Sequence, residues 1–391
     1  MKTTFKTLAI ISIVALFAFT TIPETTTRKT LSIKTEKQTP LHIEDEKDNS
    51  NIKVALLLDT SNSMDGLIDQ AKAQLWDIIN ELSYAKYGGK NPNLSIALYE
   101  YGNDDLESSD GYIRKVLNFS DDLDLISKKL FSLSTNGGSE YCGQVIKTSL
   151  DDLKWGKNKQ DLNLIFIAGN EEFTQGSISY KSATADANEK NVTVNTIFCG
   201  DYKNGVSGKW QDAATRTGGE YFAIDQNKEH VYIVTPFDDI IIQLNIDLNK
   251  TYIRYGNQGY NKMKVQAMQD SNAAELNEVV VVKRAVSKSS RMYNNASWDL
   301  VDAAKDKKFN YNKIERKNLE KHLQGKTTKE IKIYVEKQAS KRKEIKNKIN
   351  EYNTKRKQYI VKKQKGSKEG SLENALIQTI KKQAKKKNYS W

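Results

Sequence analysis

The stretch that most constrains the fold of this chain is residues 54–63, Val-Ala-Leu-Leu-Leu-Asp-Thr-Ser-Asn-Ser. An apolar run of strand length ends there on a carboxylate. Asp59 is followed at alternating positions by Ser61 and Ser63, and residues 67–82 then show apolar positions at helical spacing. We expect a buried strand that delivers a loop of oxygen-bearing side chains onto the start of a helix. Oxygen donors suit a hard divalent cation, and ligand sites of open α/β sheets lie at the carboxyl ends of strands.

Strand-like and helix-like segments alternate from about residue 51 to 255. This alternation predicts an α/β fold, a Rossmann-like and mostly parallel sheet with helices on both faces. Residues 112–119 are expected to form an edge strand antiparallel to its neighbour. The other expected strands are 52–58, 94–101, 162–168, 192–198 and 221–224, and the expected helices are 67–82, 123–133, 143–153, 178–190, 210–217 and 237–248.

The pattern Asp59-x-Ser61-x-Ser63 resembles the metal-ion-dependent adhesion site of von Willebrand factor A (VWA) domains. The resemblance implies that one Mg²⁺ or Mn²⁺ binds these side chains, and that an acidic side chain of a partner protein fills the last coordination position. The second loop of the family supplies a Thr or Ser after paired glycines. A Gly-Gly-Ser segment places Ser139 there as the fourth expected metal ligand.

The third loop departs from the family pattern, because Gly169 occupies the place of the usual Asp in Ala-Gly-Asn-Glu. Glu140, Asn170 and Glu171 are therefore further candidates as ligands or as supporting groups. Loss of one carboxylate weakens the binding of a hard cation. The same four-residue segment resembles an exported bacterial subgroup of VWA proteins, and that resemblance extends from about residue 51 to the end of the chain.

The N-terminal segment predicts export. Residues 1–21 combine two lysines with an apolar run at 8–19 that is too short to span a bilayer, as in a signal peptide. No cysteine follows the run, so a lipoprotein anchor is not expected, whereas a poor cleavage motif leaves an uncleaved N-terminal anchor open. Residues 22–50 are polar and are expected to form a disordered linker, followed by a VWA domain at 51–255. The expected location is the periplasm or the cell surface.

The C-terminal part, residues 256–391, is expected to be basic and mainly helical. Residues 1–250 carry 26 Lys and Arg against 35 Asp and Glu, whereas residues 251–391 carry 35 against 14. Residues 327–363 lack Pro and Gly and carry an apolar stripe, which predicts a long amphipathic helix, and 372–387 predict a last one. Polar Gln338, Arg342 and Arg356 interrupt the stripe, so we favour packing within a helical bundle over a tight coiled coil. Outside the cytoplasm such a region suits an anionic polymer, lipid or acidic protein better than nucleic acid.

The two cysteines, Cys142 and Cys199, are expected at the same rim of the sheet. In an oxidising compartment they could form one disulfide, and two buried thiols are the alternative. None of the three histidines follows a strand beside a nucleophile, and neither zinc-type spacing nor a phosphate-binding glycine loop is present. We therefore expect a binding module rather than an enzyme. The alternative is a metal-free structural protein of the cell envelope whose basic tail binds anionic glycan, lipid or protein.

Overall fold

A six-stranded sheet organises the fold in this computed structural model, which describes residues 50–64, 76–224, 233–364 and 372–391. The predicted signal peptide, nearly all of the predicted linker and most of the helix expected at 67–82 lie outside the described residues. The strands lie in the order β4-β3-β1-β5-β6-β7. They are β1 (Asn51–Asp59), β3 (Asn93–Tyr101), β4 (Ile113–Ser120), β5 (Leu162–Gly169), β6 (Val192–Cys199) and β7 (Tyr221–Ile224).

All neighbouring strands of this sheet are parallel except β3 and β4, which are antiparallel. The predicted mostly parallel sheet with one antiparallel edge is therefore confirmed. Because side chains alternate along a strand, Val54 and Leu56 of β1 enter one hydrophobic core and Ala55 and Leu57 enter the other. Both faces of the sheet are thus buried, as expected for parallel strands.

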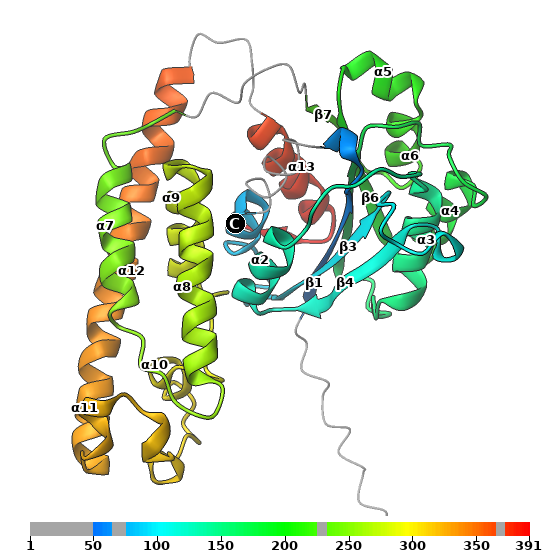
Figure 1. The fold of residues 1–391 in the computed structure, drawn as a ribbon. Helices are drawn as coiled ribbons and strands as arrows, with labels where there is room; N and C mark the ends of the chain where they lie inside the picture. The colour runs from blue at the N-terminus through cyan, green and yellow to red at the C-terminus, as the bar shows by residue number, and fades with distance from the viewer. Residues whose placement is uncertain (1–49, 65–75, 225–232, 365–371) are drawn as a thin grey trace, which may run out of the picture. The chain divides into compact units, whose positions relative to one another are not determined.

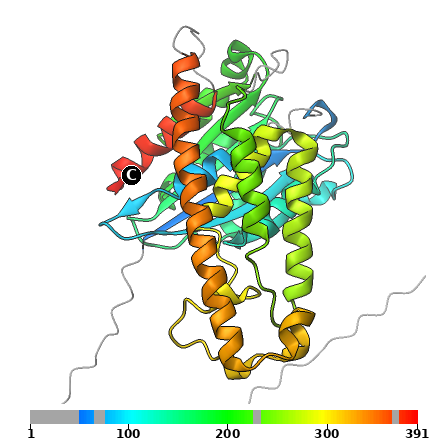
Figure 2. The same cartoon turned by 90° about the vertical axis from the view of Figure 1, so that its left-hand side faces the viewer.

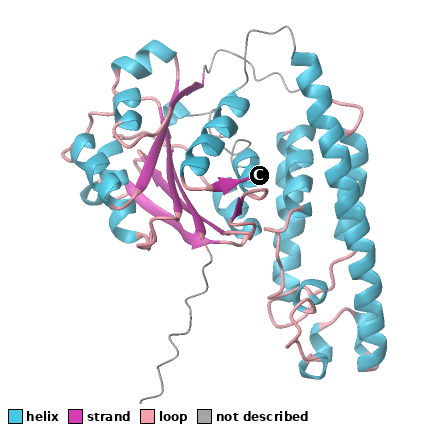
Figure 3. Cartoon of the chain, turned by 180° about the vertical axis from the view of Figure 1, so that it is seen from behind, coloured by secondary structure: helices cyan, strands magenta, loops and turns pink. Residues whose placement is uncertain are grey.

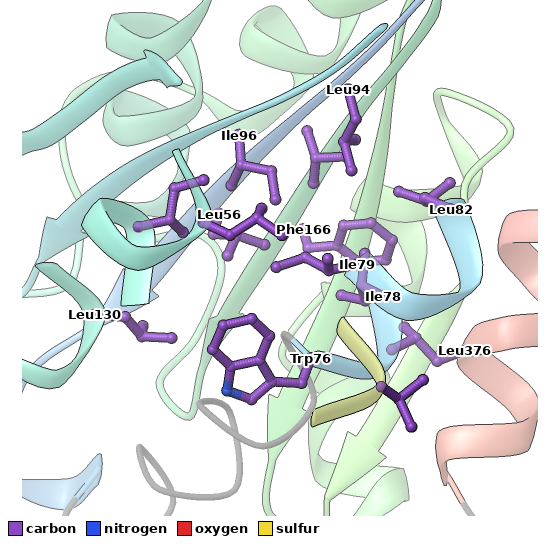
Figure 4. Close-up of a cluster of buried hydrophobic side chains, with 14 of the residues drawn as sticks. Leu56, Trp76, Ile78, Ile79, Leu82, Leu94, Ile96, Leu130, Phe166 and Leu376 are labelled. Carbon is purple, nitrogen blue, oxygen red and sulfur yellow. The ribbon is translucent and has the colours of Figure 1, made fainter. Parts of the chain in front are cut away.

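Helices cover the sheet on both sides (Figure 3). One face packs against α3 (Cys142–Asp152), α4 (Tyr180–Glu189) and α6 (Trp210–Thr215), with the short α5 (Tyr202–Ser207) nearby. The other face packs against residues 76–82, α2 (Leu123–Phe131) and α13 (Leu372–Lys386). In that core Trp76 and Leu376 lie beside the sheet residues Leu56 and Phe166 (Figure 4).

Six further helices pack together beside the sheet part, and five of them, α8 to α12, lie in the basic C-terminal part (Figure 1). They are α7 (Asp238–Asn249), α8 (Gly259–Leu276), α9 (Glu278–Ser289), α10 (Leu300–Ala303), α11 (Lys321–Gln324) and α12 (Thr328–Gln364). The long α12 packs along α7 and α9, with Ile345 and Ile349 of its apolar stripe buried. Arg342, which interrupts the stripe, is buried in ion pairs with Asp299 and Asp302. The preference for packing within a bundle is therefore confirmed. In the described part of the chain, no helix is long and apolar enough to cross a membrane.

Buried charges join the helical part to the sheet part. Arg284 on α9 pairs with Asp124 on α2 (2.8 Å) and with Asp270 on α8 (2.5 Å), and Lys288 pairs with Asp270 (2.7 Å). Removing one member of such a buried set typically costs about 3–5 kcal/mol, because the remaining charge is left uncompensated. The boundary at residue 255 stays a prediction, but the packing is continuous across it.

The C-terminal segment returns to the sheet. Leu376, Ile380 and Ala384 of α13 enter the same core as β1. Beyond α13, β8 (Tyr389–Ser390) pairs antiparallel with β2 (Lys86–Tyr87). This helix therefore completes one layer of the sheet domain instead of belonging to the bundle of α7, α8, α9 and α12.

Candidate metal site

Three neighbouring strands end at one edge of the sheet, and their last residues form the floor of the site. Asp59 ends β1, Tyr101 lies opposite it at the end of β3, and Gly169 ends β5. The backbone N–H of Thr60 donates to the carbonyl of Tyr101 (2.9 Å), and that of Ser61 donates to Asp59 Oδ1 (2.8 Å). The loop after β1 is thereby folded back over the Asp59 carboxylate.

The two predicted serines connect this loop to the third loop. The Ser61 and Ser63 hydroxyls lie 2.8 Å apart, and the Ser63 hydroxyl donates to Asn170 Oδ1 (3.0 Å). Asp59 and Ser61 are buried, whereas Ser63 is exposed. The structure therefore brings together Asp59, Ser61, Ser63 and Asn170. The side-chain atoms through which they contact one another are oxygens.

Glu140 reaches the same place from the second loop. It is buried and lies against Asp59, and Gly102 packs against both side chains. A Cβ atom at Gly102 would be 2.7 Å from Asp59 Oδ1 and 2.9 Å from Glu140 Cγ, and the φ of Gly102 is +76°. Both the space and the backbone conformation therefore require glycine here, and the absence of a side chain lets two carboxylates share one small volume.

Burial sets the electrostatics of this pair. Burial raises the pKa of Asp59 well above its usual range, and the neighbouring Glu140 carboxylate raises it further. Burial also raises the pKa of Glu140, against the neighbouring Asp59 and Ser61 side chains, which lower it. Two adjacent buried carboxylates favour a proton or a cation between them, because each destabilises the negative charge of the other.

One oxygen of each carboxylate has no partner among the described residues: Asp59 Oδ2 and Glu140 Oε2. Buried polar atoms are normally hydrogen-bonded, so this pair is suited to an additional positive group. The described residues contain no cluster of three or more His, Cys, Asp or Glu side chains that could hold a metal. A cation here would therefore depend on hydroxyl and amide oxygens as well as on the two carboxylates, a donor set that fits Mg²⁺ or Mn²⁺ rather than a soft metal.

Ser139 and Glu171, two other predicted site residues, make no hydrogen bond to Asp59, Ser61 or Ser63 among the described residues. Ser139 is half-buried, and within the described ranges its hydroxyl makes no hydrogen bond. Glu171 is exposed, and its carboxylate accepts from Gln175 Nε2 (3.4 Å). The second loop thus turns Glu140, one residue beyond the predicted ligand, toward Asp59. The sequence predicts Glu140 only as a candidate ligand or supporting group behind Ser139, and its position next to Ser139 is the one available signal.

Gly169 shows why the third loop lacks the usual Asp. A Cβ atom at this position would be 2.5 Å from the Tyr101 hydroxyl, 3.0 Å from the Trp210 ring and 3.2 Å from Asp59 Cβ. The Tyr101 hydroxyl donates to the carbonyl of Ala168 (3.0 Å). A tyrosine and a tryptophan therefore occupy the space that a larger residue at 169 would need.

The predicted disulfide is not formed, because Cys142 and Cys199 are both free and buried. Cys142 belongs to the core on one face of the sheet and Cys199 to the core on the other face. The expectation of a shared rim ignored this difference in face. Burial raises the pKa of both thiols, which disfavours the reactive thiolate.

Comparison with known families agrees with this geometry. Residues 53–245 match the von Willebrand factor type A domain family. Together with the fold, this match shows that the chain contains a VWA domain. None of the curated proteins matches the sequence.

Several solved structures are similar to a little under half of the chain. BatB from Bacteroides thetaiotaomicron is 19% identical, with 45% of this chain and 91% of that chain covered and a TM-score of 0.34. The SpRpn10 VWA domain is 13% identical over 46% and 90%, with a TM-score of 0.36. Proximal thread matrix protein 1 from the mussel byssus, described with a zinc-occupied MIDAS motif, is 10% identical over 46% and 43%, with a TM-score of 0.34.

Proposed function

We propose that this protein is an exported binding module of the cell envelope that recognises an acidic side chain of a partner protein through a divalent cation. The observation that carries the proposal is the pair of unpartnered oxygens, Asp59 Oδ2 and Glu140 Oε2, in a buried site at the carboxyl edge of the sheet. A VWA domain built on residues 53–245 gives the fold in which such sites occur.

The residues that would hold Mg²⁺ or Mn²⁺ are Asp59, Ser61, Ser63 and Glu140, with Asn170 as a neutral donor. When bound, the ion would supply a positive centre that attracts a carboxylate of the partner. Asp59 and Glu140 offer negative charge, and Ser61 and Ser63 offer hydroxyl oxygens held 2.8 Å apart. The predicted ligand Ser139 remains a candidate that substitution can test separately.

Isothermal calorimetry with Mg²⁺ and Mn²⁺ tests the site on the full mature chain. Asp59→Ala should abolish metal binding. The variant should still fold, because relief of the repulsion between two adjacent buried carboxylates offsets the loss of the hydrogen bond from the Ser61 N–H. Asp110→Ala is the control, since Asp110 is an exposed acid on another loop. Equal metal affinity in wild type and Asp59→Ala would refute the proposed site.

Partner binding tests the function itself. Mature protein should retain an envelope protein from an extract in the presence of Mg²⁺, and a chelator or Asp59→Ala should release it. Export is tested by N-terminal sequencing of protein recovered from cells, which should begin near residue 22 if the signal peptide is cleaved. We also propose that the domain has no catalytic role, and a partner recovered unmodified would agree with this.

A second candidate function is a metal-free envelope protein whose basic helices bind an anionic polymer. The observation that favours it is the lysine-rich surface of α13, on which Lys385 and Lys386 are exposed, together with the missing carboxylate at Gly169. Binding of this kind should weaken steeply with ionic strength and should be insensitive to chelators. Binding through a metal should instead be lost with a chelator and should depend much less on ionic strength.

A further inference from the structure

A groove of about 890 Å³ runs between α12 and the segment that follows α9. Figure 2 shows α12 beside this segment in the lower part of the view. One wall is a face of α12 from Lys332 to Asn350, and the other wall comes from residues 289–311. The groove lies in the helical part of the chain, on different elements from the candidate metal site.

Several of the cations that line the groove are already neutralised. Arg342 pairs with Asp299 (2.6 Å) and Asp302 (3.2 Å), and Lys305 pairs with Asp302 (2.7 Å). Arg291 donates to three backbone carbonyls of the sheet part, at distances of 3.1 to 3.2 Å. Of these three side chains, Arg342 joins the two walls of the groove, and all three already have partners of their own.

Three other lysines of the groove have no such partner. Within the residues that the structure describes, the ammonium groups of Lys307, Lys343 and Lys346 make no ion pair or hydrogen bond. Lys307 and Lys343 are exposed, and Lys346 is half-buried.

The acids of the groove do not balance these lysines. The Asp306 Oδ1 atom accepts from the backbone N–H of Lys308 (2.8 Å), and Glu336 lies 4.0 Å from Lys332. These two are the only acids that line the groove among the described residues, against seven Lys and Arg side chains. The groove is left with an excess of positive charge.

Lys346 is the most informative of the three free lysines. Its pKa is lowered to about 8, because burial and the cations of Lys305 and Arg342, which lower it, outweigh the carboxylates of Asp302 and Asp299, which raise it. A partly desolvated ammonium group with two cations near it is unfavourable by itself. A bound anion would relieve both the desolvation and the repulsion.

We infer that this groove binds a small multivalent anion of the phosphate class, with the Lys346 ammonium as the inner contact and Lys343 and Lys307 at the mouth. Lysine binds phosphate groups as a compact point charge, and three free cations match an anion that carries two or more negative charges. Val335, Ala339 and Phe309 line the same groove and offer apolar surface to the uncharged part of such a ligand. The inference goes beyond the proposed metal-dependent function and does not depend on it.

Calorimetry with pyrophosphate as the probe tests the inference on the full mature chain, without divalent cations and at constant ionic strength. Wild type should bind, Lys346→Met should bind at least tenfold more weakly, and Lys346→Arg should retain most of the affinity. Lys337→Met is the matched control, because Lys337 is an exposed lysine of the same helix that does not line the groove. It should bind as wild type does.

The inference is overturned if wild type does not bind pyrophosphate, or if Lys346→Met binds it as tightly as wild type. An equal loss in Lys337→Met would also overturn it, because the effect would then be one of net charge. Should Lys346→Met fail to fold, the exposed double variant Lys307→Met/Lys343→Met replaces it, with an expected loss of severalfold. Asp59→Ala should bind pyrophosphate normally, so failure of the metal site and failure of this groove are distinguishable.

Discussion

Gln383 of α13 and Asn195 of β6 exchange two side-chain hydrogen bonds in the buried interface between helix and sheet. Gln383 Nε2 donates to Asn195 Oδ1 (2.7 Å), and Asn195 Nδ2 donates to Gln383 Oε1 (3.2 Å). Asn195 Oδ1 also accepts from the backbone N–H of Glu220 (3.0 Å). The pair therefore connects the last helix, the sheet and the entry to β7, at a sequence separation of 188 residues.

Gln383→Ala is expected to destabilise the protein by about 1–3 kcal/mol, because it leaves the buried Asn195 amide without its partner. Urea denaturation measures the change. Gln378→Ala is the control, since Gln378 is an exposed residue of the same helix. A stability equal to wild type would mean that the paired amides do not hold α13 on the sheet.

Glu140→Gln is expected to change stability and metal affinity in opposite directions. It removes one of two adjacent buried carboxylates, so the metal-free protein should melt at a higher temperature. Affinity for Mg²⁺ should fall by about tenfold or more, since each 1.4 kcal/mol of lost attraction is a factor of ten. Ser139→Ala should change neither quantity if Glu140 is the second-loop ligand. If Ser139→Ala abolishes binding and Glu140→Gln does not, the assignment must be reversed.

The role of the third loop can be tested by introducing an aspartate at position 170 or at position 169. Asn170→Asp is expected to strengthen Mg²⁺ binding by about tenfold, because Asn170 Oδ1 already accepts a hydrogen bond from Ser63. Gly169→Asp is expected to destabilise the fold by about 1–3 kcal/mol through overpacking, because a Cβ there meets the Tyr101 hydroxyl and Trp210. Calorimetry measures the Mg²⁺ affinity of both variants, and thermal unfolding measures their stability. Unchanged affinity in Asn170→Asp, or unchanged stability in Gly169→Asp, would contradict the prediction.

Asp270→Asn is expected to reveal an acid-sensitive contribution to stability. Burial alone would raise the pKa of Asp270, but the cations of Lys288 and Arg284 outweigh burial and hold the pKa at about 2. Since the pKa of Asp in an unfolded chain is about 4, the ionised side chain stabilises the fold above that pH. The contribution disappears as pH falls through about 2.

At pH 7 the Asp270→Asn variant should lose about 3–5 kcal/mol, because Arg284 and Lys288 stay buried with less compensation. The difference from wild type should shrink between pH 4 and pH 2. Chemical denaturation at a series of pH values measures it. Asp306→Asn, which alters an exposed acid, should show no such trend.

The sheet and its order of elements could be predicted because each strand carries a local signal. The apolar run of β5, for example, shows its type within eight residues. The return of α13 to the sheet could not be predicted in the same way. An amphipathic stripe says that one face of a helix is buried but does not say against which element.

At the candidate site, Asp59, Ser61 and Ser63 could be predicted because they directly follow a strand, whose end point fixes where they lie. Glu140 could not be separated from Ser139, because a glycine-rich loop has no periodicity to say which of two adjacent residues turns inward. The same limit explains why the predicted disulfide is not formed. Chain spacing placed Cys142 and Cys199 near one rim, but the face that each occupies depends on packing.

The pairing of β8 with β2, and the hydrogen bond from the Tyr389 hydroxyl to the carbonyl of Asn51 (3.0 Å), bring the last described residues against the first strand of the sheet. Leu376, Ile380 and Tyr389 cover apolar side chains that begin at Ile52. During synthesis, a nascent chain on the ribosome cannot bury this surface until more than 320 residues beyond Ile52 have been translated, since Leu376 follows Ile52 by 376 − 52 = 324 residues. Complete folding of the domain therefore waits until α13 and β8 have been synthesised, which leaves time for a chaperone to engage the polypeptide first.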